Sequence, residues 1–506
     1  MKDGKNNSYS DWTSLAKTIS PETKSFVNGA FVDSVSGSTF DVINPATEEL
    51  LASVSECGKE DVDRAVKIAR QAYESGVWSN LSPRERKDKL LCLADLMERD
   101  AEELMLLESL DIGKSISEVV HYDVPESIRT IRWTAESLDK LYGEVAPTGP
   151  NTLALVTRNS LGVVGAVTPW NYPLMIACWK IAPALAMGNS VILKPAEQTP
   201  LTALKLAALT LEAGIPKGVF NVLPGFGPTA GKALGEHSDV DVITFTGSTA
   251  VGKLFMQYSG SSNLKRVSLE CGGKSPNIVF ADADDLEAAA KTAAAAIFIS
   301  QGQVCVAGSR LLVESSIAEK FTNLVHKAAE SYVPGDPLDP ETKFGAIVSD
   351  EQLKSVSGYV DSGIKEGANL LLGGKKTSVN KVGNFMEATI FNQVKPTMKI
   401  ATEEIFGPVL SIISFDNEKD AIRIANNSRY GLAAAVWTSS LDRAHRVSAA
   451  LEAGTVWVNC YGDGDITVPL GGFKQSGFGS DKSLHAFDKF SDLKTTWIAL
   501  KKPSEN

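Results

Sequence analysis

Cysteine and histidine are scarce in this chain, and long hydrophobic runs are missing. The 506 residues include six cysteines and five histidines, with no CxxC pair. We therefore expect neither a disulfide framework nor a metal site. No run approaches the 18 apolar residues of a membrane-spanning helix, and the opening MKDGKNNSYSDW lacks the apolar segment of a signal peptide. These absences predict a cytoplasmic protein with no membrane partner.

An excess of positive charge is missing as well. The chain has 50 lysines and arginines against 61 acidic residues, a net charge of −11, which argues against nucleic acid as a partner. An anionic small molecule is not excluded, because backbone amides at a helix start can bind phosphate. The length predicts two or three domains.

Strands and helices alternate regularly from Gly162 onward. The runs GVVGAV, SVILKP, VFNVLPG and VDVITF predict strands, and PLMIACWKIAPALAMG and TALKLAALTLEAG predict the helices between them. This alternation is typical of a parallel sheet covered by helices, the architecture of nucleotide-binding domains. A second α/β block follows, with NIVF, RLLVE, VLSIISF and TVWVN as strands and AEKFTNLVHKAAESY as a helix.

Three further segments carry local predictions. Residues 1–25 are polar and lack periodicity, so we expect a loose N-terminal arm. Ser82 and Glu85 form the pattern of a capping box around Pro83, which predicts a helix start. The tail FSDLKTTWIAL predicts a strand offered to a neighbour.

One cysteine stands in an unusual setting. Cys305 lies in ISQGQVCVAGSR, between Gly302 and Gly308. A structural cysteine usually packs in an apolar helix or strand. A cysteine in a glycine-rich loop favours a chemical role, so Cys305 is a candidate nucleophile.

Two other polar residues have both a chemical and an ordinary interpretation. Glu270 ends the apolar strand RVSLE before two glycines, where it can be a general base or a surface carboxylate before a turn. Cys271, beside it, is expected to be a small buried filler. Asn171 follows a Pro-Trp turn, where its amide can donate to an oxyanion or cap the next helix.

Phosphate-binding signals are present but weak one by one. PGFGPTAG, which contains Gly227, imitates a dinucleotide fingerprint, although such glycines often form ordinary turns. Gly247 and Ser248 open a helix after a strand and can hold a pyrophosphate, or can simply form a strand-to-helix turn. Lys194 and Glu197 follow another strand, where they can bind ribose hydroxyls or form a solvated pair.

The order of the motifs is more informative than any one of them. TPWNYPL, LKPAEQTP, FTGSTAVG, LECGGKSP, GQVCVAGSR, EEIFGPV and GGFKQSGFG follow one another along the chain. This series resembles that of the NAD(P)-dependent aldehyde dehydrogenase superfamily, and the resemblance runs from about Phe26 to Trp497.

The resemblance implies an α/β aldehyde dehydrogenase fold with a Rossmann-like cofactor domain, an α/β catalytic domain and a small oligomerisation region. The implied boundaries are 1–141 with 161–272 for the NAD-binding domain, 273–472 for the catalytic domain, and 142–160 with 485–500 for oligomerisation. A homodimer or homotetramer is expected.

The resemblance also implies a mechanism that ends in hydrolysis. Cys305 would attack the aldehyde to give a thiohemiacetal, whose alkoxide the Asn171 amide and the Cys305 backbone N–H would stabilise. Hydride loss would give a thioester, and Glu270 would activate water to release the carboxylic acid. Branches that pass the acyl group to coenzyme A generally lack this base. Lys180 and Asp481 match positions proposed for proton relay, although a helix-face lysine and a surface aspartate are equally acceptable interpretations.

The implied NAD contacts lie in the same motifs. They include the adenosine-ribose pair, the pyrophosphate contact and the nicotinamide-ribose clamp, carried by Thr168, Trp170, Lys194, Glu197, Gly227, Gly247, Ser248, Glu404 and Phe406. Two positions depart from the pattern of most members. Ser300 replaces an asparagine, and Ser480 replaces an arginine, which leaves the ion pairing around Asp481 open.

The tail NCYGDGDITVPLGGFKQSGFGSDKSLHAF resembles most closely the γ-glutamyl-γ-aminobutyraldehyde dehydrogenases of putrescine breakdown, within polyamine catabolism. This resemblance implies an ω-aminoaldehyde substrate; the alternative is a broad-specificity aliphatic or betaine aldehyde dehydrogenase. We expect a substrate funnel in which carboxylates attract an ammonium group and aromatic rings add a cation–π surface. The candidates are Asp463, Asp465, Asp123, Glu126, Tyr172 and Trp179, with Trp170 as a further aromatic wall.

Two other classes of protein stay open. Cys305 can belong to a cysteine hydrolase, although none of the five histidines lies in a triad motif. The chain can also be a catalytically silent protein, since the superfamily includes crystallins. Retention of Cys305, Glu270, Asn171, Lys194 and Glu197 argues against a silent protein.

Overall fold

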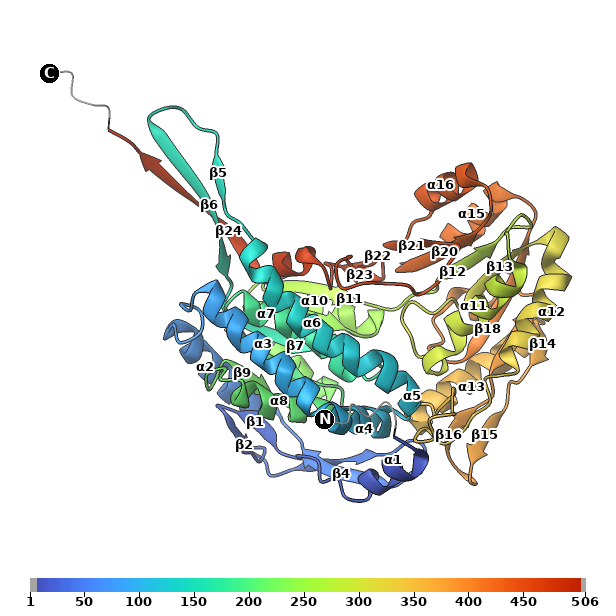
Figure 1. Ribbon diagram of the computed structural model, residues 1–506, viewed down its shortest axis with the longest axis horizontal. Helices are drawn as coiled ribbons and strands as arrows, with labels where there is room; N and C mark the ends of the chain where they lie inside the picture. The colour runs from blue at the N-terminus through green and yellow to red at the C-terminus, as the bar shows by residue number, and fades with distance from the viewer. Residues whose placement is uncertain (1–6, 502–506) are drawn as a thin grey trace.

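A computed structural model describes residues 7–501 of the chain. Figure 1 shows two α/β bodies, each built on its own sheet, and an arm of strands that extends away from the first body and ends near the C-terminus. No helix within residues 7–501 combines the length and the apolar character needed to cross a bilayer.

The first sheet has eight strands, and its five inner strands run parallel, as predicted. The two edges are antiparallel, because β1 pairs with β9 and β23 pairs with β11. In spatial order the strands are β2 (Ala30–Val32), β1 (Ser25–Val27), β9 (Phe220–Val222), β8 (Ser190–Lys194), β7 (Val163–Val167), β10 (Val242–Thr246), β11 (Arg266–Glu270) and β23 (Gly477–Phe478).

Helices around this sheet bury its apolar strands. β7 and β8 are buried at every position, which explains why they read as continuous apolar runs and not as alternating ones. The helices are α2 (Lys59–Glu74), α3 (Pro83–Arg99), α4 (Ala101–Ile112), α5 (Ile116–Glu118), α6 (Val124–Ser137), α7 (Pro173–Ala186), α8 (Leu201–Glu212), α9 (Lys232–Glu236) and α10 (Thr249–Ser261).

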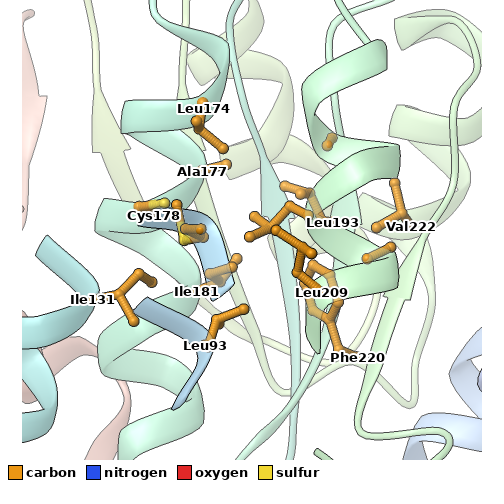
Figure 2. Packing of buried hydrophobic residues seen from close by; sticks show 14 of the residues in the cluster. Leu93, Ile131, Leu174, Ala177, Cys178, Ile181, Leu193, Leu209, Phe220 and Val222 are labelled. Atoms are coloured by element: carbon orange, nitrogen blue, oxygen red, sulfur yellow. The ribbon is translucent and has the colours of Figure 1, made fainter. Parts of the chain in front are cut away.

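The predicted start of α3 is confirmed. The Ser82 side chain accepts a hydrogen bond from the Glu85 backbone N–H, and the Glu85 carboxylate accepts one from the Ser82 N–H in return. Figure 2 shows part of the core around this helix, in which Leu93, Ile131 of α6 and Cys178 of α7 belong to one buried cluster. Cys178 is fully buried and packs as a small apolar side chain.

The second sheet has seven strands, six of them parallel and β14 antiparallel at one edge. All four strands predicted here are present. The strands in spatial order are β14 (Asn369–Leu372), β17 (Thr389–Asn392), β18 (Val409–Phe415), β13 (Arg310–Glu314), β12 (Pro276–Val279), β20 (Ala433–Trp437) and β21 (Thr455–Val458). The helices are α11 (Leu286–Phe298), α12 (Ala318–Ala329), α13 (Asp350–Lys365), α14 (Lys399–Thr402), α15 (Glu418–Asn426) and α16 (Leu441–Ala450).

The arm is a three-stranded sheet in the order β24–β6–β5. β24 (Ser491–Ala499) pairs along its whole length with β6 (Thr152–Ser160), and β5 (Glu144–Ala146) covers the other edge of β6. The predicted tail strand is therefore present, but one of its edges is already paired within the chain. Its other edge pairs with no strand of residues 7–501, and Leu493 and Trp497 are 62% and 64% exposed.

The N-terminal segment contradicts the expectation of a loose arm over the part that the structure describes. Residues Tyr9–Ala16 form helix α1, which a Ser8–Asp11 capping box starts and a fully buried Trp12 fixes to the core. One buried indole supplies enough apolar area to order a short polar helix. Residues 1–6 lie outside the described part.

Smaller elements complete the chain. They are β3 (Thr39–Ile43), β4 (Leu50–Ser55), β15 (Lys376–Val379), β16 (Val382–Met386), β19 (Tyr430–Gly431) and β22 (Phe473–Lys474), the π-helical turns Val119–Asp123 and Gly227–Gly231, and the 3₁₀ turns Leu138–Lys140, Ile299–Gly302, Ser315–Ile317 and Leu484–Lys489.

Candidate active site

The loop that carries Cys305 has an unusual backbone. After α11 ends, Ser300, Gln301 and Gly302 have φ angles of 49°, 56° and 69°. Left-handed backbone is unfavourable for residues other than glycine and persists only where the surroundings impose it. The strain therefore indicates that the exact path of this loop matters.

Cys305 lies where two cavities approach each other. Cys305 itself lines a cavity of about 200 Å³ together with Asn171, Glu270, Glu404 and other residues. Its neighbours Val304 and Val306 line a second cavity of about 600 Å³. A group on Cys305 can thus contact ligands on both sides.

Asn171 supports this loop and does not cap the following helix. Its Nδ2 donates a hydrogen bond to the Gln303 carbonyl oxygen over 2.7 Å. The N-cap position of α7 is Tyr172, whose side chain makes no capping bond. The capping interpretation is therefore wrong, and the second N–H of the amide stays available for an oxyanion.

The thiol of Cys305 is held in its neutral form. Burial raises its pKa to about 12, and the nearby carboxylates Glu404 and Glu270 add to the rise. The nucleophilic form of a cysteine is the thiolate, so attack on an aldehyde calls for a site that favours it. In the protein alone the opposite holds, because described residues around the sulfur supply negative charge and no cation.

Glu270 lies at the end of β11, and its side chain is buried. Burial raises its pKa well above the ordinary value, Asp481 adds to the rise, and Lys489 and Lys180 oppose it. Its Oε1 has no hydrogen-bond partner among residues 7–501. A carboxylate with these properties is a stronger base than an exposed one, so the interpretation as a surface residue is wrong.

Lys180 and Asp481 are both fully buried, which contradicts the surface interpretation of each. Lys180 Nζ donates to Asp481 Oδ2 over 3.1 Å. Lys489 Nζ donates to the other oxygen, Oδ1. Lys489 thus supplies the second cation to Asp481, at a site where residue 480 is a serine. Sequence reasoning missed Lys489, because nothing but the fold brings the 3₁₀ turn of Leu484–Lys489 to Asp481.

A polar cleft follows the carboxyl ends of the first sheet. Lys194 ends β8 and bonds Glu197 over 3.1 Å, and the Thr168 N–H, past the end of β7, donates to the Lys194 carbonyl. Ser248 caps α10 by accepting from the Val251 N–H, and its hydroxyl hydrogen can still donate. Gly227 lies in a π-helical turn beside Phe226, which lines a further cavity of about 610 Å³ together with Glu197.

The nicotinamide end of the predicted cofactor site lies at the smaller cavity. Trp170 meets Phe406 edge to face with ring centroids 5.1 Å apart, and both line this cavity. Glu404 accepts from the Gly273 N–H over 3.0 Å, and burial raises its pKa to about 7. Gly247 lines the same cavity. A Cβ at Gly272 would collide with the Glu404 carboxylate, which explains the glycine there.

The residues of this cleft fit a dinucleotide. Thr246 Oγ1 lines the smaller cavity and is buried with no hydrogen-bond partner within residues 7–501. Such an unpaired polar atom at the end of a parallel strand indicates a place for a polar ligand. In the same part of the chain, no group of three or more His, Cys, Asp or Glu side chains is arranged to hold a metal ion.

The larger of the two cavities beside Cys305, about 600 Å³, has four tyrosines in its lining. Tyr122, Tyr172, Tyr332 and Tyr461 line it, and Asp463 and Glu118 are its carboxylates. Asp463 is thus placed as predicted. Glu118 was not predicted.

The other three predicted carboxylates lie elsewhere. Asp123 is fully buried and bonds Lys114 Nζ over 2.5 Å, and burial raises its pKa to about 7 although Lys114 lowers it. Asp465 and Glu126 both pair with Arg129 and do not line the cavity. The prediction failed for these three because each has a cation within the chain.

Two predicted aromatic contacts also need correction. Trp179 packs beside Tyr172 and lies 5.8 Å from Lys482 Nζ, outside the lining of the larger cavity. Tyr172 lines the cavity, but Lys114 Nζ lies 3.4 Å from its ring centroid. One face of that ring is therefore already occupied by a cation of the protein.

Comparison with known proteins agrees with this arrangement. The model of the aldehyde dehydrogenase family matches residues 31–496. The chain belongs to this family. It is accordingly an NAD(P)-dependent aldehyde dehydrogenase, and the cysteine hydrolase alternative is excluded.

Individual relatives are similar along nearly their whole length. The chain is 50% identical to the NADP/NAD-dependent aldehyde dehydrogenase PuuC of Escherichia coli, covering 97% of this chain and 98% of that protein. The crystal structure of the aldehyde dehydrogenase KauB from Pseudomonas aeruginosa superposes with a TM-score of 0.97 at 56% identity, over 98% of this chain and 100% of that one. That of γ-glutamyl-γ-aminobutyraldehyde dehydrogenase from Burkholderia cenocepacia gives 0.96 at 53% identity, with the same coverage.

Proposed function

We propose that the enzyme oxidises ω-aminoaldehydes, including γ-glutamylated ones, to carboxylic acids with NAD as the preferred cofactor. The observation that carries the proposal is the larger cavity beside Cys305, which combines tyrosine walls with two carboxylates, Asp463 and Glu118, against one lysine, Lys343. Such a wall attracts an ammonium group and disfavours an anionic one. Similarity to a γ-glutamyl-γ-aminobutyraldehyde dehydrogenase supports the same substrate class and a place in polyamine catabolism.

The first chemical step needs a base. Because the pKa of Cys305 is raised to about 12, Glu270 takes the thiol proton as Sγ bonds to the aldehyde carbon. The carbonyl oxygen becomes an alkoxide, which the free N–H of Asn171 and the Cys305 backbone N–H stabilise. When bound in the cleft, the oxidised nicotinamide supplies a positively charged ring that accepts hydride from the thiohemiacetal carbon.

The second step releases the acid. Loss of hydride leaves a thioester on Cys305, and Glu270, after giving its proton to solvent, removes a proton from water as the water oxygen attacks the acyl carbon. The C–S bond breaks, and the leaving sulfur takes the proton back from Glu270, which regenerates the thiol. Lys180 and Asp481, whose charges act on Glu270, serve the exchange of its proton.

The cofactor preference rests on Glu197. Lys194 and Glu197 form the pair that receives the adenosine ribose, and a 2′-phosphate would place negative charge against the Glu197 carboxylate. Lys194 offsets part of this repulsion, so we expect preference for NAD over NADP and not exclusion of NADP.

The remaining parts of the proposal concern assembly and location. We propose the same domain boundaries as the family resemblance implies, with 142–160 and 485–500 as the oligomerisation region of a homodimer or homotetramer in the cytoplasm. The exposed apolar side chains of the arm and the free edge of β24 support this assignment.

A matched pair of aldehydes tests the substrate class. 3-Aminopropanal and butanal differ by an ammonium in place of a methyl group, so their kcat/KM ratio with NAD isolates amine recognition. We expect the ratio to favour 3-aminopropanal, with Cys305→Ala as the inactive control. Higher kcat/KM for butanal and hexanal would indicate a broad aliphatic aldehyde dehydrogenase instead. Higher kcat/KM for betaine aldehyde than for 3-aminopropanal would indicate a betaine aldehyde dehydrogenase.

A further inference from the structure

Glu118 is a carboxylate on the wall of the larger cavity, and within residues 7–501 no arginine or lysine lies at hydrogen-bond distance from it. It ends α5, and its side chain is 14% exposed. Its oxygens accept hydrogen bonds from the Ser300 N–H, over 3.1 Å, and from the Ser300 hydroxyl. Both donors are neutral, so they orient the carboxylate without cancelling its charge.

The lysine nearest to Glu118 is engaged elsewhere. Lys114 Nζ lies 3.9 Å from Glu118, beyond hydrogen-bond distance, but bonds Asp123 over 2.5 Å and lies against the ring of Tyr172. Both Lys114 and Asp123 are fully buried. Lys114 therefore forms its closer ion pair with Asp123 and a longer one with Glu118, so it offsets only part of the Glu118 charge.

The other ionisable groups of the cavity differ from Glu118. Asp463 and Lys343 are exposed, and solvent screens their charges. His121 uses its Nδ1 for the Ser117 carbonyl oxygen. Among the charged residues that line the cavity, Glu118 is the one that is largely shielded from water and turned toward the ligand space, where a charge acts most strongly.

Glu118 is also tied to the loop that carries the nucleophile. Ser300, which holds the carboxylate, bonds the Tyr172 hydroxyl over 3.1 Å and starts the left-handed run that leads to Cys305. The separation between the carboxylate and the reactive sulfur therefore depends on a short loop, three residues of which have left-handed backbone. A fixed separation selects substrates by length as well as by charge.

We propose that Glu118 is the specificity-determining residue that binds the ammonium group of the substrate while Cys305 holds the aldehyde end. This inference rests on the proposed function and adds its recognition group. It also explains why residue 300 is a serine, whose hydroxyl and N–H together orient the carboxylate. A series of aminoaldehydes of increasing length should show a minimum of KM at the length that spans the two residues.

The test compares Glu118→Gln with the parent enzyme on 3-aminopropanal, 4-aminobutanal, 5-aminopentanal and butanal, with saturating NAD. Glutamine keeps an acceptor for Ser300 but removes the charge. We expect the KM ratio of the best aminoaldehyde to butanal to rise roughly tenfold to a hundredfold, the range for loss of a charged hydrogen bond. The length minimum should disappear.

Two further variants make the result specific. Asp465→Asn removes a carboxylate that Arg129 already pairs, so the KM ratio should stay as in the parent. Glu118→Asp keeps the charge at a shorter reach and should retain part of the preference, which also covers poor folding of the glutamine variant.

Three outcomes would overturn the assignment or its basis. If Glu118→Gln lowers kcat for both aldehyde classes in proportion and leaves the KM ratio unchanged, Glu118 only positions the loop. If the ratio stays unchanged with normal kcat, another group binds the amine. If the parent itself does not prefer aminoaldehydes to butanal, the proposed function fails, whatever the variants do.

Discussion

The raised pKa of Cys305 leads to a prediction about its alkylation rate. From an ordinary value of 9.0 the pKa rises to about 12, which lowers the thiolate fraction near neutral pH about 1000-fold and corresponds to about 4 kcal/mol. A thiolate of higher basicity is also more nucleophilic, by about 20-fold for a shift of this size. The net expectation is a rate about 50-fold below that of a small cysteine peptide.

Iodoacetamide labelling of the cofactor-free enzyme measures this rate. Because the raised pKa keeps the Cys305 thiol neutral, the thiolate accumulates only as the pH approaches about 12. The rate constant should therefore rise about tenfold per pH unit from pH 7.5 to 10.5 without a plateau. Limited access to the sulfur lowers every rate equally and leaves this slope intact.

Peptide mass spectrometry assigns the label to Cys305 and separates it from the exposed Cys92, and Cys305→Ala supplies the blank. A plateau between pH 8 and 9 would refute the reasoning, because it would mean that the thiol ionises as freely as in an unfolded peptide. Labelling at pH 7.5 as fast as the peptide would refute it as well.

Four further outcomes follow from the same structure. Glu270→Gln should remove the pre-steady-state burst of NADH together with turnover, because the neutral thiol of Cys305 then lacks its base; a burst of full size would show that Glu270 acts on water alone. Lys489→Met should move the acidic limb of the kcat/KM profile to higher pH, since Lys489 lowers the pKa of Glu270, and Lys489→Arg should restore the parent profile; an unmoved limb would contradict the coupling. Glu197→Gln should raise kcat/KM for NADP relative to NAD, and equal use of both cofactors by the parent would refute the argument for preference. Trp497→Asp should reduce the oligomer mass measured by light scattering, and an unchanged mass would exclude the exposed face of β24 from the interface.

Local sequence patterns were enough for most of the fold. The strands β7 and β8 are buried at every position because helices cover both faces of their sheet. The Ser82–Glu85 capping box lies in the first turn of α3 and marks its start in the sequence. β20 escaped prediction because its run of three alanines lacks the branched side chains that indicate strands. Trp12 likewise gives no local sign of the surface that buries it.

In the site as well, some features could be predicted from the sequence and others depend on the tertiary structure. Cys305 and Glu270 could be predicted from sequence because glycine-rich turns at the ends of strands are local features, and the family resemblance that these motifs support is confirmed. The charges around them depend on partners far away in the chain, such as Asp481 for Lys180 and Ser300 for Glu118. A sequence shows that a carboxylate is present; only the tertiary structure decides whether a buried lysine neutralises it, as for Asp123, or whether it keeps its charge for a substrate, because that choice depends on distance and burial.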